Sequence, residues 1–182
     1  ENFDLVVIGG GPGGYSAALY AASAGLSVAL VEKDKLGGTC LNRGCIPAKA
    51  FLETAAVHRH VQHAADFGIE SSSPQVRFEV TQARKQKIVS GLVAGIGAMC
   101  KARKVTVFNG EGSLRPGRRV DVRHEDGSTT EISATHVLLA AGSVPRTIPG
   151  FDPGGAIMTS DEVLELETVP ARIAVIGGGA IG

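Results

Sequence analysis

Short apolar runs alternate with helix-forming stretches at the beginning of the chain. Residues 4–8 are apolar, residues 9–14 are rich in glycine, and residues 15–24 are good helix formers, with Gly25 placed to end a helix. A second apolar run covers residues 26–32. Uninterrupted apolar runs of this length are typical of buried parallel strands, so the pattern predicts a β-α-β unit.

Two longer helices are predicted in the next part of the chain. Residues 45–65 have a helical pattern in which Pro47 is tolerated, because it falls in the first turn. After a polar break at residues 71–74, residues 78–103 predict a second helix. Its apolar side chains recur every three or four residues and are expected to share one buried face. They include Ile88, Leu92, Val93, Ile96 and Met99.

The pattern then changes to short segments that predict strands. Residues 105–108, 119–123 and 129–132 are separated by Asn-Gly, Pro-Gly and Asp-Gly pairs, which are typical of tight turns. We therefore expect an antiparallel β-meander inserted in an α/β domain. Residues 136–140 return to an apolar run that predicts a buried parallel strand, and Gly142 breaks it.

The last part of the chain predicts a second domain. Residues 148–170 hold several prolines and glycines and are interpreted as a crossover linker. Residues 172–176 predict one more buried strand, which leads into a second glycine-rich turn at 177–182. The predicted fold class is α/β: a doubly wound Rossmann-like domain with an inserted antiparallel β-meander, plus the first strand and turn of a second Rossmann-like domain.

Composition and charge narrow the classes of function. The chain has 182 residues, of which 43% are hydrophobic, so a disordered chain is not expected. Its 18 basic residues balance 18 acidic ones, which argues against nucleic acid or an anionic membrane as the main partner. No apolar run is long enough to span a bilayer. Because a strand begins almost at once, we also expect no signal peptide.

The first glycine-rich segment has the spacing of a dinucleotide-binding turn. Gly9, Gly11 and Gly14 form a G-x-G-x-x-G motif between the first predicted strand and helix. In such turns the three glycines allow a tight turn, close approach of a pyrophosphate, and packing of helix on strand. Glu32 ends the second strand, at roughly the 20-residue spacing where an acid binds ribose hydroxyls. The alternative is a glycine-rich turn without a ligand, which the agreement of strand, helix and acid disfavours.

Two of the three cysteines, Cys40 and Cys45, lie close together in the segment GGTCLNRGCIPAK. Cys45 is at the start of a predicted helix, where the helix dipole favours the thiolate, and Lys49 adds positive charge one turn later. The pair therefore predicts redox chemistry, with two structural cysteines or half of a zinc site as alternatives. Zinc needs four ligands, and no second Cys or His pair is suitably placed.

The remaining thiol and a cluster of imidazoles are interpreted without a chemical role. His58, His60 and His63 do not all share one face of their helix, so we expect them to face solvent. Cys100 lies on the apolar side of the second long helix, where a thiol packs as a small hydrophobic group. No metal site is predicted.

The segment GGTCLNRGCIPAK resembles the redox signature of the pyridine nucleotide–disulfide oxidoreductases. The opening ENFDLVVIGGGPGGYSAALYAA is similar to the FAD-binding start of that family, and THVLLAAGSVPRTIPG to its second FAD-contacting strand and loop. The residues that flank the two cysteines are more similar to the dihydrolipoamide dehydrogenase group than to glutathione or mercuric reductases. The resemblance covers the whole chain, with its motifs in the family's order.

The resemblance implies a role for each motif residue. Cys40 would be the interchange thiol that meets the dithiol substrate, Cys45 the charge-transfer thiol that faces the flavin, and Lys49 a neighbour of the isoalloxazine edge. Glu32 would bind the adenosine ribose. The other residues of the FAD site would be Gly9, Gly11, Gly14, Gly38, Thr39, Gly112, Ala141, Gly142 and Ser143.

The second glycine motif, formed by Gly177, Gly179 and Gly182, opens the NAD-binding domain in that family. Glycine rather than alanine at its third position favours NAD over NADP. The implied organisation is a first FAD-binding segment at residues 1–147, a crossover linker at 148–170 and the truncated start of an NAD-binding domain at 171–182.

The implied function is a flavoprotein disulfide oxidoreductase that oxidises dihydrolipoamide through Cys40 and Cys45 and FAD to reduce NAD. The substrate would be carried by the lipoyl domain of a 2-oxoacid dehydrogenase or glycine cleavage complex. The full-length enzyme would be a homodimer in the cytoplasm or mitochondrial matrix, with no nucleic acid or membrane as partner. Its acid–base histidine would lie outside this chain, which alone would be inactive.

Two alternatives stay open at this point. One is another disulfide reductase of the same fold, and the other is a non-catalytic FAD- or nucleotide-binding fragment. The chain departs from the family pattern at Arg43, Ala48 and Ala141, where a small apolar residue, serine and threonine are usual. Arg43 adds a cation between the two cysteines and is expected to affect thiol pKa or substrate preference.

Overall fold

The computed structural model describes all residues from 1 to 182, and the chain divides into two compact units. The first, here called the sheet unit, comprises Glu1–Asn42 and Ser90–Val144. The second, the helix unit, comprises Arg43–Val89 and Pro145–Gly182. Both units are discontinuous in sequence, and the long helix α4 (Phe78–Ala102) contributes residues to each.

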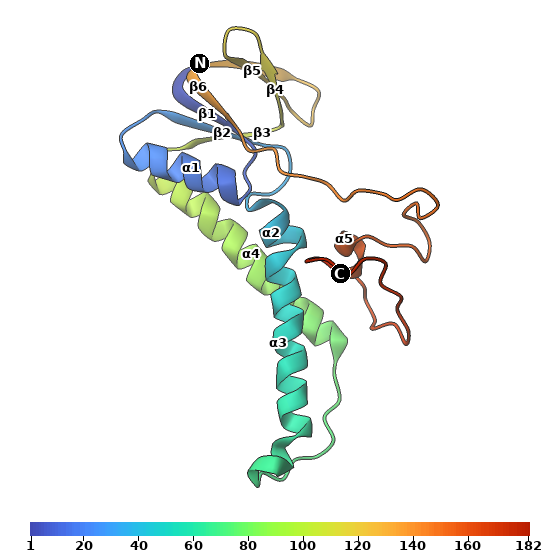
Figure 1. Cartoon of the computed structure of the whole chain (residues 1–182). Helices are drawn as coiled ribbons and strands as arrows, with labels where there is room; N and C mark the ends of the chain where they lie inside the picture. Colours follow the sequence, from blue (N-terminus) through green and yellow to red (C-terminus); the bar gives the residue numbers. More distant parts are fainter. The chain divides into compact units, whose positions relative to one another are not determined.

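A six-stranded sheet forms the sheet unit, with its strands in the order β3-β2-β1-β6-β5-β4 (Figure 1). The strands are Asn2–Ile8 (β1), Val28–Glu32 (β2), Thr106–Asn109 (β3), Glu111–Arg115 (β4), Arg119–Arg123 (β5) and Thr129–Leu139 (β6). β1 pairs in parallel with β2 and with the end of β6, whereas β4, β5 and the start of β6 form an antiparallel meander. The predicted α/β class with an inserted meander is therefore confirmed.

The predicted β-α-β unit is also present. Helix α1 (Pro12–Ser23) connects β1 to β2 and packs against both. It begins inside the glycine-rich segment, because a proline fits the first helical position, where its missing N–H leaves no hydrogen bond unmade. α1 covers one face of the parallel strands, and the meander folds over the other (Figure 1).

The core of the sheet unit lies between the parallel strands and the meander. Val6 and Val31 from the parallel strands meet Val120, Val122 and Ile132 from the meander, and all five are almost fully buried. Alternate residues of each parallel strand point to opposite faces, and both faces are covered. This is the reason why these strands are continuous apolar runs in the sequence.

Strand β6 is one continuous strand of 11 residues, so the prediction of two separate strands at 129–132 and 136–140 is wrong. Its first half pairs antiparallel with β5 and its second half parallel with β1. The predicted burial of the second half is also wrong, because Leu138 and Leu139 are 37% and 62% exposed. In this half β6 pairs with β1 alone, since its pairing with β5 ends at Ser133.

The segment predicted as the first meander strand belongs instead to the parallel sheet. β3 pairs in parallel with β2, and the meander begins with β4, which the pattern did not predict. Between them, the Gly110 N–H donates to the Glu32 carbonyl at 2.9 Å, and a Cβ at Gly110 would lie 2.6 Å from the Arg123 carbonyl oxygen. The Asn-Gly pair is therefore not a hairpin turn. It connects β3, which pairs with β2, to β4, which pairs with β5.

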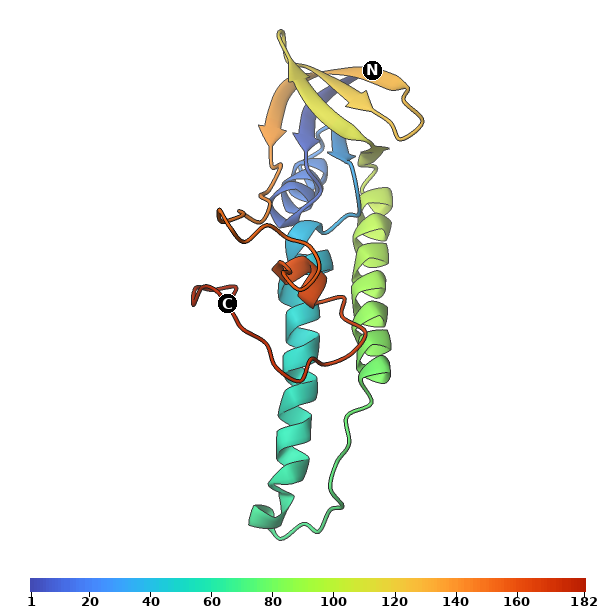
Figure 2. The same ribbon diagram turned by 90° about the vertical axis from the view of Figure 1, so that its right-hand side faces the viewer.

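Helix α3 (Cys45–Gln62) and the first part of α4 lie side by side in the helix unit (Figure 2). Phe51 of α3 stacks on Phe78 of α4, with ring centroids 5.6 Å apart. Both predicted long helices are confirmed to within a few residues. The short helices are α2 (Gly38–Arg43), η1 (Ala64–Phe67) and α5 (Ser160–Val163).

The buried face of α4 agrees with the predicted one only in part: Ile96 is buried and Ile88 and Val93 are half-buried, as predicted. The buried positions are Thr81, Lys85, Val89, Ile96 and Cys100. Leu92 and Met99, which were predicted on the buried face, are 44% and 43% exposed. Leu92 and Met99 each lie one residue before a more buried position, Val93 and Cys100. Apolar spacing of three and four residues did not distinguish these neighbouring positions.

Residues 145–182 contain little regular structure apart from α5 and two isolated bridges. The prediction of a buried strand at 172–176 is wrong: no strand is present, and Ile173, Val175 and Ile176 are 57%, 61% and 61% exposed. A parallel strand needs a neighbouring strand for its backbone hydrogen bonds, and the helix unit contains none. Of the helices of this chain, none combines the length and apolar character needed to cross a membrane.

Candidate nucleotide site and redox segment

The first glycine turn follows β1. At two of its glycines the backbone is too close to leave room for a side chain. Gly9 has a φ of +107°, and a Cβ there would lie 2.2 Å from the Ala140 carbonyl oxygen. A Cβ at Gly14 would lie 1.7 Å from the Gly9 carbonyl oxygen. Gly11 is different, because a Cβ there would meet only the Gly38 Cα, at 3.7 Å. A Cβ at Gly11 would thus make only an ordinary contact, without a clash.

The Glu32 carboxylate connects the end of β2 to this turn. Its Oε2 accepts a hydrogen bond from the Gly10 N–H at 2.7 Å, and its Oε1 accepts from the Asp34 N–H at 2.9 Å. A charged acceptor on backbone N–H groups makes a stronger hydrogen bond than a neutral one. Glu32 was predicted only as a ligand of the ribose. In the structure its carboxylate also holds the glycine turn in place.

A second glycine-rich loop packs against the first one. The Gly37 N–H donates to the Gly10 carbonyl at 2.8 Å, and a Cβ at Gly38 would lie 2.6 Å from the Gly11 Cα. Asn42 fixes this loop, because its Nδ2 donates to the Leu36 and Gly38 carbonyls at 3.1 and 3.0 Å. Sequence reasoning missed Asn42, although it lies between the two cysteines. The Asn42 Oδ1 is buried without a hydrogen-bond partner.

The remaining predicted FAD residues of the sheet unit meet at the same edge. Gly112 of β4 lies over β1 and β2, since a Cβ there would be 3.0 Å from Ile8 Cγ2 and 3.1 Å from Val31 Cγ1. The Ala140 N–H donates to the Ile8 carbonyl at 2.8 Å, which brings the exposed residues 141–143 beside the glycine turn. The carboxyl edge of parallel strands is where α/β folds bind nucleotides.

The two cysteines lie on consecutive helices. Cys40 is in α2 and partly buried, whereas Cys45 is the first residue of α3 and exposed. Lys49, one turn further along α3, is exposed too. The predicted position of Cys45 at a helix start is confirmed. Thr39 is exposed on α2, close in sequence to the loop that Asn42 fixes.

The other cysteine and the histidines occupy different surroundings. Cys100 is buried, and this burial raises the pKa of its thiol. The His63 Nδ1 lies 3.7 Å from the Asp66 carboxylate at the exposed end of α3. No group of three or more His, Cys, Asp and Glu side chains in the chain is arranged to hold a metal ion.

The second glycine turn repeats the backbone geometry of the first. Gly177 has a φ of +109°, and a Cβ at Gly182 would lie 1.9 Å from the Gly177 carbonyl oxygen. A Cβ at Gly179 would have no atom within 4 Å. The motif spacing alone is therefore sufficient to form the turn, even where its flanking strand is absent.

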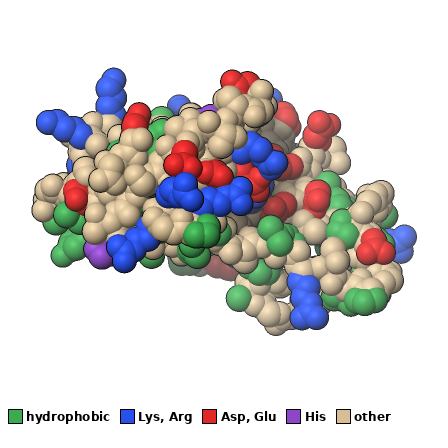
Figure 3. Space-filling model, turned by 90° about the horizontal axis from the view of Figure 1, so that it is seen from above, with side chains coloured by type: hydrophobic (Ala, Val, Ile, Leu, Met, Phe, Trp, Pro, Cys, Tyr) green, Lys and Arg blue, Asp and Glu red, His purple; other side chains and the backbone are tan.

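Ion pairs connect neighbouring strands of the meander. They are Arg115–Asp121 at 2.7 Å, Arg119–Glu131 at 3.4 Å and Arg123–Glu111. Acidic and basic side chains are interspersed on the face seen in Figure 3. This face offers no continuous basic patch of the kind that binds a polyanion.

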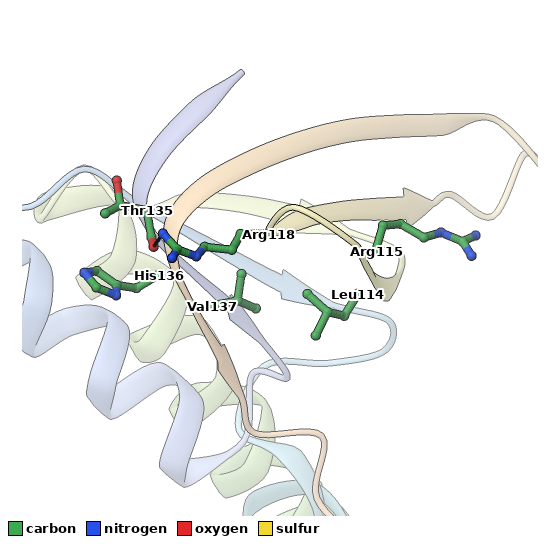
Figure 4. A pocket seen from close by; sticks show the side chains of 6 residues that line it. All are labelled: Leu114, Arg115, Arg118, Thr135, His136 and Val137. Carbon is green, nitrogen blue, oxygen red and sulfur yellow. Dashed lines mark hydrogen bonds between the residues drawn. The ribbon is translucent and has the colours of Figure 1, made fainter.

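A pocket of about 420 Å³ lies between β4 and β6 (Figure 4). It is lined by Leu114, Arg115, Arg118, Thr135, His136 and Val137. The Arg118 guanidinium donates to the Thr135 carbonyl at 3.1 Å, and that of Arg115 pairs with Asp121. His136 pairs with Leu5, three positions before the end of β1, so the pocket is not at the edge where the glycines meet.

Comparison with known proteins identifies the family. The model of the pyridine nucleotide-disulphide oxidoreductase family matches residues 3–182. Together with the two glycine turns and the cysteine segment, this match means that the chain belongs to that family.

Individual relatives carry a more specific name. A dihydrolipoyl dehydrogenase of Chlamydia pneumoniae is 45% identical over 182 residues, which is 100% of this chain and 39% of the relative. One from Bacillus subtilis is 42% identical over 191 residues, which is 100% of this chain and 40% of the relative. The crystal structure of LpdA from Mycobacterium tuberculosis matches with a TM-score of 0.84 and 30% identity, over 91% of this chain and 38% of that one. The chain thus spans about two fifths of the length of the relatives it matches.

Proposed function

We propose that this chain is the FAD-binding part of a dihydrolipoyl dehydrogenase, whose complete form oxidises dihydrolipoamide and reduces NAD. The observation that carries the proposal is Cys45 at the first position of α3, with Cys40 just before it in a segment that resembles the family's redox signature. The names of the relatives from Chlamydia pneumoniae and Bacillus subtilis support the choice of dithiol substrate.

The residues at the carboxyl edge of the sheet fit FAD. The absence of a side chain at Gly11 lets a pyrophosphate approach the backbone, and the first-turn N–H groups of α1 supply donors for its phosphates. The Glu32 carboxylate is an acceptor for ribose hydroxyls. When bound, FAD would supply two-electron transfer between the thiols and NAD. The proposed site is completed by Gly38, Thr39, Lys49, Gly112, Ala141, Gly142 and Ser143.

The chain's own chemistry in this proposal is thiol–disulfide exchange. Cys40 and Cys45 are reduced thiols in this structure, and the proposed step begins from their oxidised, disulfide-bonded form. A thiolate of dihydrolipoamide attacks the Sγ of Cys40, the disulfide bond from Cys40 to Cys45 breaks, and Cys45 leaves as a thiolate with the electron pair. The second substrate thiol then attacks the substrate sulfur of the mixed disulfide and displaces Cys40. The substrate loses two electrons and the cysteine pair gains them. One substrate proton ends on Cys40, and the other is released.

The start of α3 favours this reaction because it stabilises the leaving group. The partial positive charge of a helix N-terminus and a nearby cation both favour a thiolate over a thiol. Cys45 occupies that terminus, and Lys49 lies one turn further along. The position of Cys45 at this terminus supports its proposed role as the leaving group.

The rest of the proposed organisation follows from the same family membership. Residues 1–147 form the first FAD segment, residues 148–170 the linker and residues 171–182 the start of the NAD domain, where Gly177, Gly179 and Gly182 receive the NAD pyrophosphate. The complete protein is proposed to be a cytoplasmic homodimer that accepts lipoyl domains.

The test is an absorption spectrum of the complete flavoprotein carrying Cys40→Ser. We expect a long-wavelength charge-transfer band in the absence of any reductant, because Cys45 then stays a thiolate beside the flavin. Cys45→Ser is the matched control and should lack the band, with the same amount of bound flavin. Equal spectra for the two variants would contradict the assigned roles, and failure of all forms to take up FAD would contradict the proposed site.

A further inference from the structure

Lys85 is a buried cation outside the site described above. It is 1% exposed, although it lies on α4 among residues that are mostly in contact with solvent. Lysine is almost never fully buried unless its ammonium group is paired and hydrogen-bonded. The position therefore requires specific partners, and they show what the residue does.

The partners of Lys85 all come from one segment far along the chain. Its Nζ donates to the Leu164 carbonyl at 3.0 Å and to the Glu165 Oε1 at 2.7 Å. It also lies 5.8 Å from the centroid of the Phe51 ring on α3. Glu165 itself is exposed, so the carbonyl of Leu164 is the partner that keeps the ammonium group in its buried place.

Gln82, almost one turn before Lys85 on α4, contacts the same segment. Its Nε2 donates to the Leu166 carbonyl at 2.5 Å and to the Leu164 carbonyl at 3.3 Å. Residues 164–166 follow α5 and are here called the strap. Two side chains of α4 thus bind two backbone carbonyls of the strap, which have no strand or helix partner in a segment of this kind.

The chain after the strap continues along the same pair of helices. Val169 lines an apolar groove together with Phe51, Phe78 and Thr81, which come from α3 and α4. Beyond this point the chain has no regular secondary structure up to Gly182. The contacts of residues 164–169 therefore precede the second glycine turn with no helix or strand between them.

We propose that Lys85 and Gln82 form a clamp that fixes the strap on the helix pair α3–α4 and sets the position from which the second glycine turn extends. Lys85 is the main component, because its bond to Leu164 is charge-assisted and shielded from water. Gln82 adds neutral bonds that hold the strap from its other end. This inference does not depend on the redox activity.

The clamp is tested by cleavage of the full chain with a Glu-specific protease. Glu167 lies just beyond the strap and reports its release, whereas Glu70, in the exposed loop after η1, is an internal reference. We expect Lys85→Met to raise the rate of cleavage at Glu167 about tenfold relative to Glu70, because the fraction of released strap increases by that factor. Lys101→Met, an exposed change in the last turn of α4, should leave the ratio unchanged.

Two further variants separate the clamp from general destabilisation. Gln82→Leu keeps Lys85 in place and should raise the ratio about threefold. Glu165→Gln should change it less than twofold, because Glu165 is exposed and the Leu164 bond remains. Unchanged cleavage ratios in both Lys85→Met and Gln82→Leu, with helical content retained, would overturn the proposal. If Lys85→Met lost its helical content, the ratio in Gln82→Leu would decide the matter alone.

Discussion

The two glycine turns have nearly the same local geometry in different surroundings. A Cβ at Gly14 would lie 1.7 Å from the Gly9 carbonyl oxygen and 3.3 Å from Val7 Cγ1. At Gly182 the corresponding distances, to Gly177 and Val175, are 1.9 and 3.4 Å. The strand before the first turn is buried, whereas the residues before the second are exposed. The turn thus depends only on the spacing of its own glycines, whereas a strand forms only where a neighbouring strand can pair with it.

The largest difference between the turns is expected from alanine at their third glycine. Gly14→Ala places a methyl group against backbone that is fixed by β1 and α1, and should lower the free energy of unfolding by about 3 kcal/mol. Gly182→Ala makes the same local contact in an unpaired segment and should change it by less than about 0.5 kcal/mol. Urea denaturation followed by circular dichroism measures both.

Gly13→Ala is the matched control for that pair. A Cβ at Gly13 would have no atom within 4 Å, so alanine should stabilise α1 by about 0.5–1 kcal/mol. Equal losses for Gly14→Ala and Gly182→Ala would show that the second turn is as firmly held as the first.

The residues that precede the two turns give the next largest expected effect on stability. Val7 is fully buried and Val175 is 61% exposed. Removing two buried carbons by Val7→Ala should cost about 2 kcal/mol of unfolding free energy, because burial of each is worth about 0.8 kcal/mol and a cavity adds to the loss. Val175→Ala should be neutral in this chain. A cost above 1 kcal/mol for Val175→Ala would mean that residues 172–176 pack more firmly than the exposed side chains indicate.

A smaller effect on stability is expected at Glu32, whose carboxylate binds the backbone of the first turn. Glu32→Gln keeps one acceptor for the Gly10 N–H but loses its charge and the second acceptor, and should lower the unfolding free energy by about 1 kcal/mol. In the complete protein it should also weaken FAD binding, measured by flavin release on dilution. Lys33→Gln, an exposed change next to it, serves as the control. An unchanged stability of Glu32→Gln would show that the turn does not need this carboxylate.

The smallest effect on stability is expected five residues before each turn, where Asp4 precedes Gly9 and Arg172 precedes Gly177. The Ser27 hydroxyl and backbone N–H donate to the Asp4 carboxylate and lower its pKa below the ordinary 3.8. A lowered folded-state pKa gives stability that is present above the ordinary value and is lost as the pH falls through the folded one. Asp4→Asn should therefore flatten the acid side of the stability curve. An identical curve for Asp4→Asn and the unchanged chain would exclude this contribution.

Much of the fold could be predicted from the sequence where one local rule decides the structure. The β-α-β unit, the start of α3 at Cys45 and both glycine turns depend on apolar runs and glycine spacing within about 30 residues. The partners of β3 and the continuity of β6 depend on pairing between distant segments, and the pattern did not contain them. Predictions of strand burial failed at residues 136–140 and 172–176, since apolar composition does not reveal which neighbours are present.

The sequence supplied candidate residues for the site, but not the contacts that they make. Family resemblance led to Gly9, Glu32 and Gly38, and the structure places them at one edge of the sheet. Asn42 and Lys85 were missed because an amide inside a motif and a lysine among other charged residues carry no distinctive signal. Both donate to backbone carbonyls, which every residue has and which no sequence pattern marks, and Lys85 also pairs with Glu165.

Strand β6 has a consequence for how the family can vary in length. The first half of β6 is in register with β5 and its second half with β1. One inserted residue within 129–139 would therefore move the side chains of one half to the opposite face of the sheet, either in the meander core or in the residues that lead to Ala141. The loop at residues 124–128 has no such double constraint. Insertions and deletions accumulated during evolution should therefore concentrate in that loop and be absent from the strand that follows it.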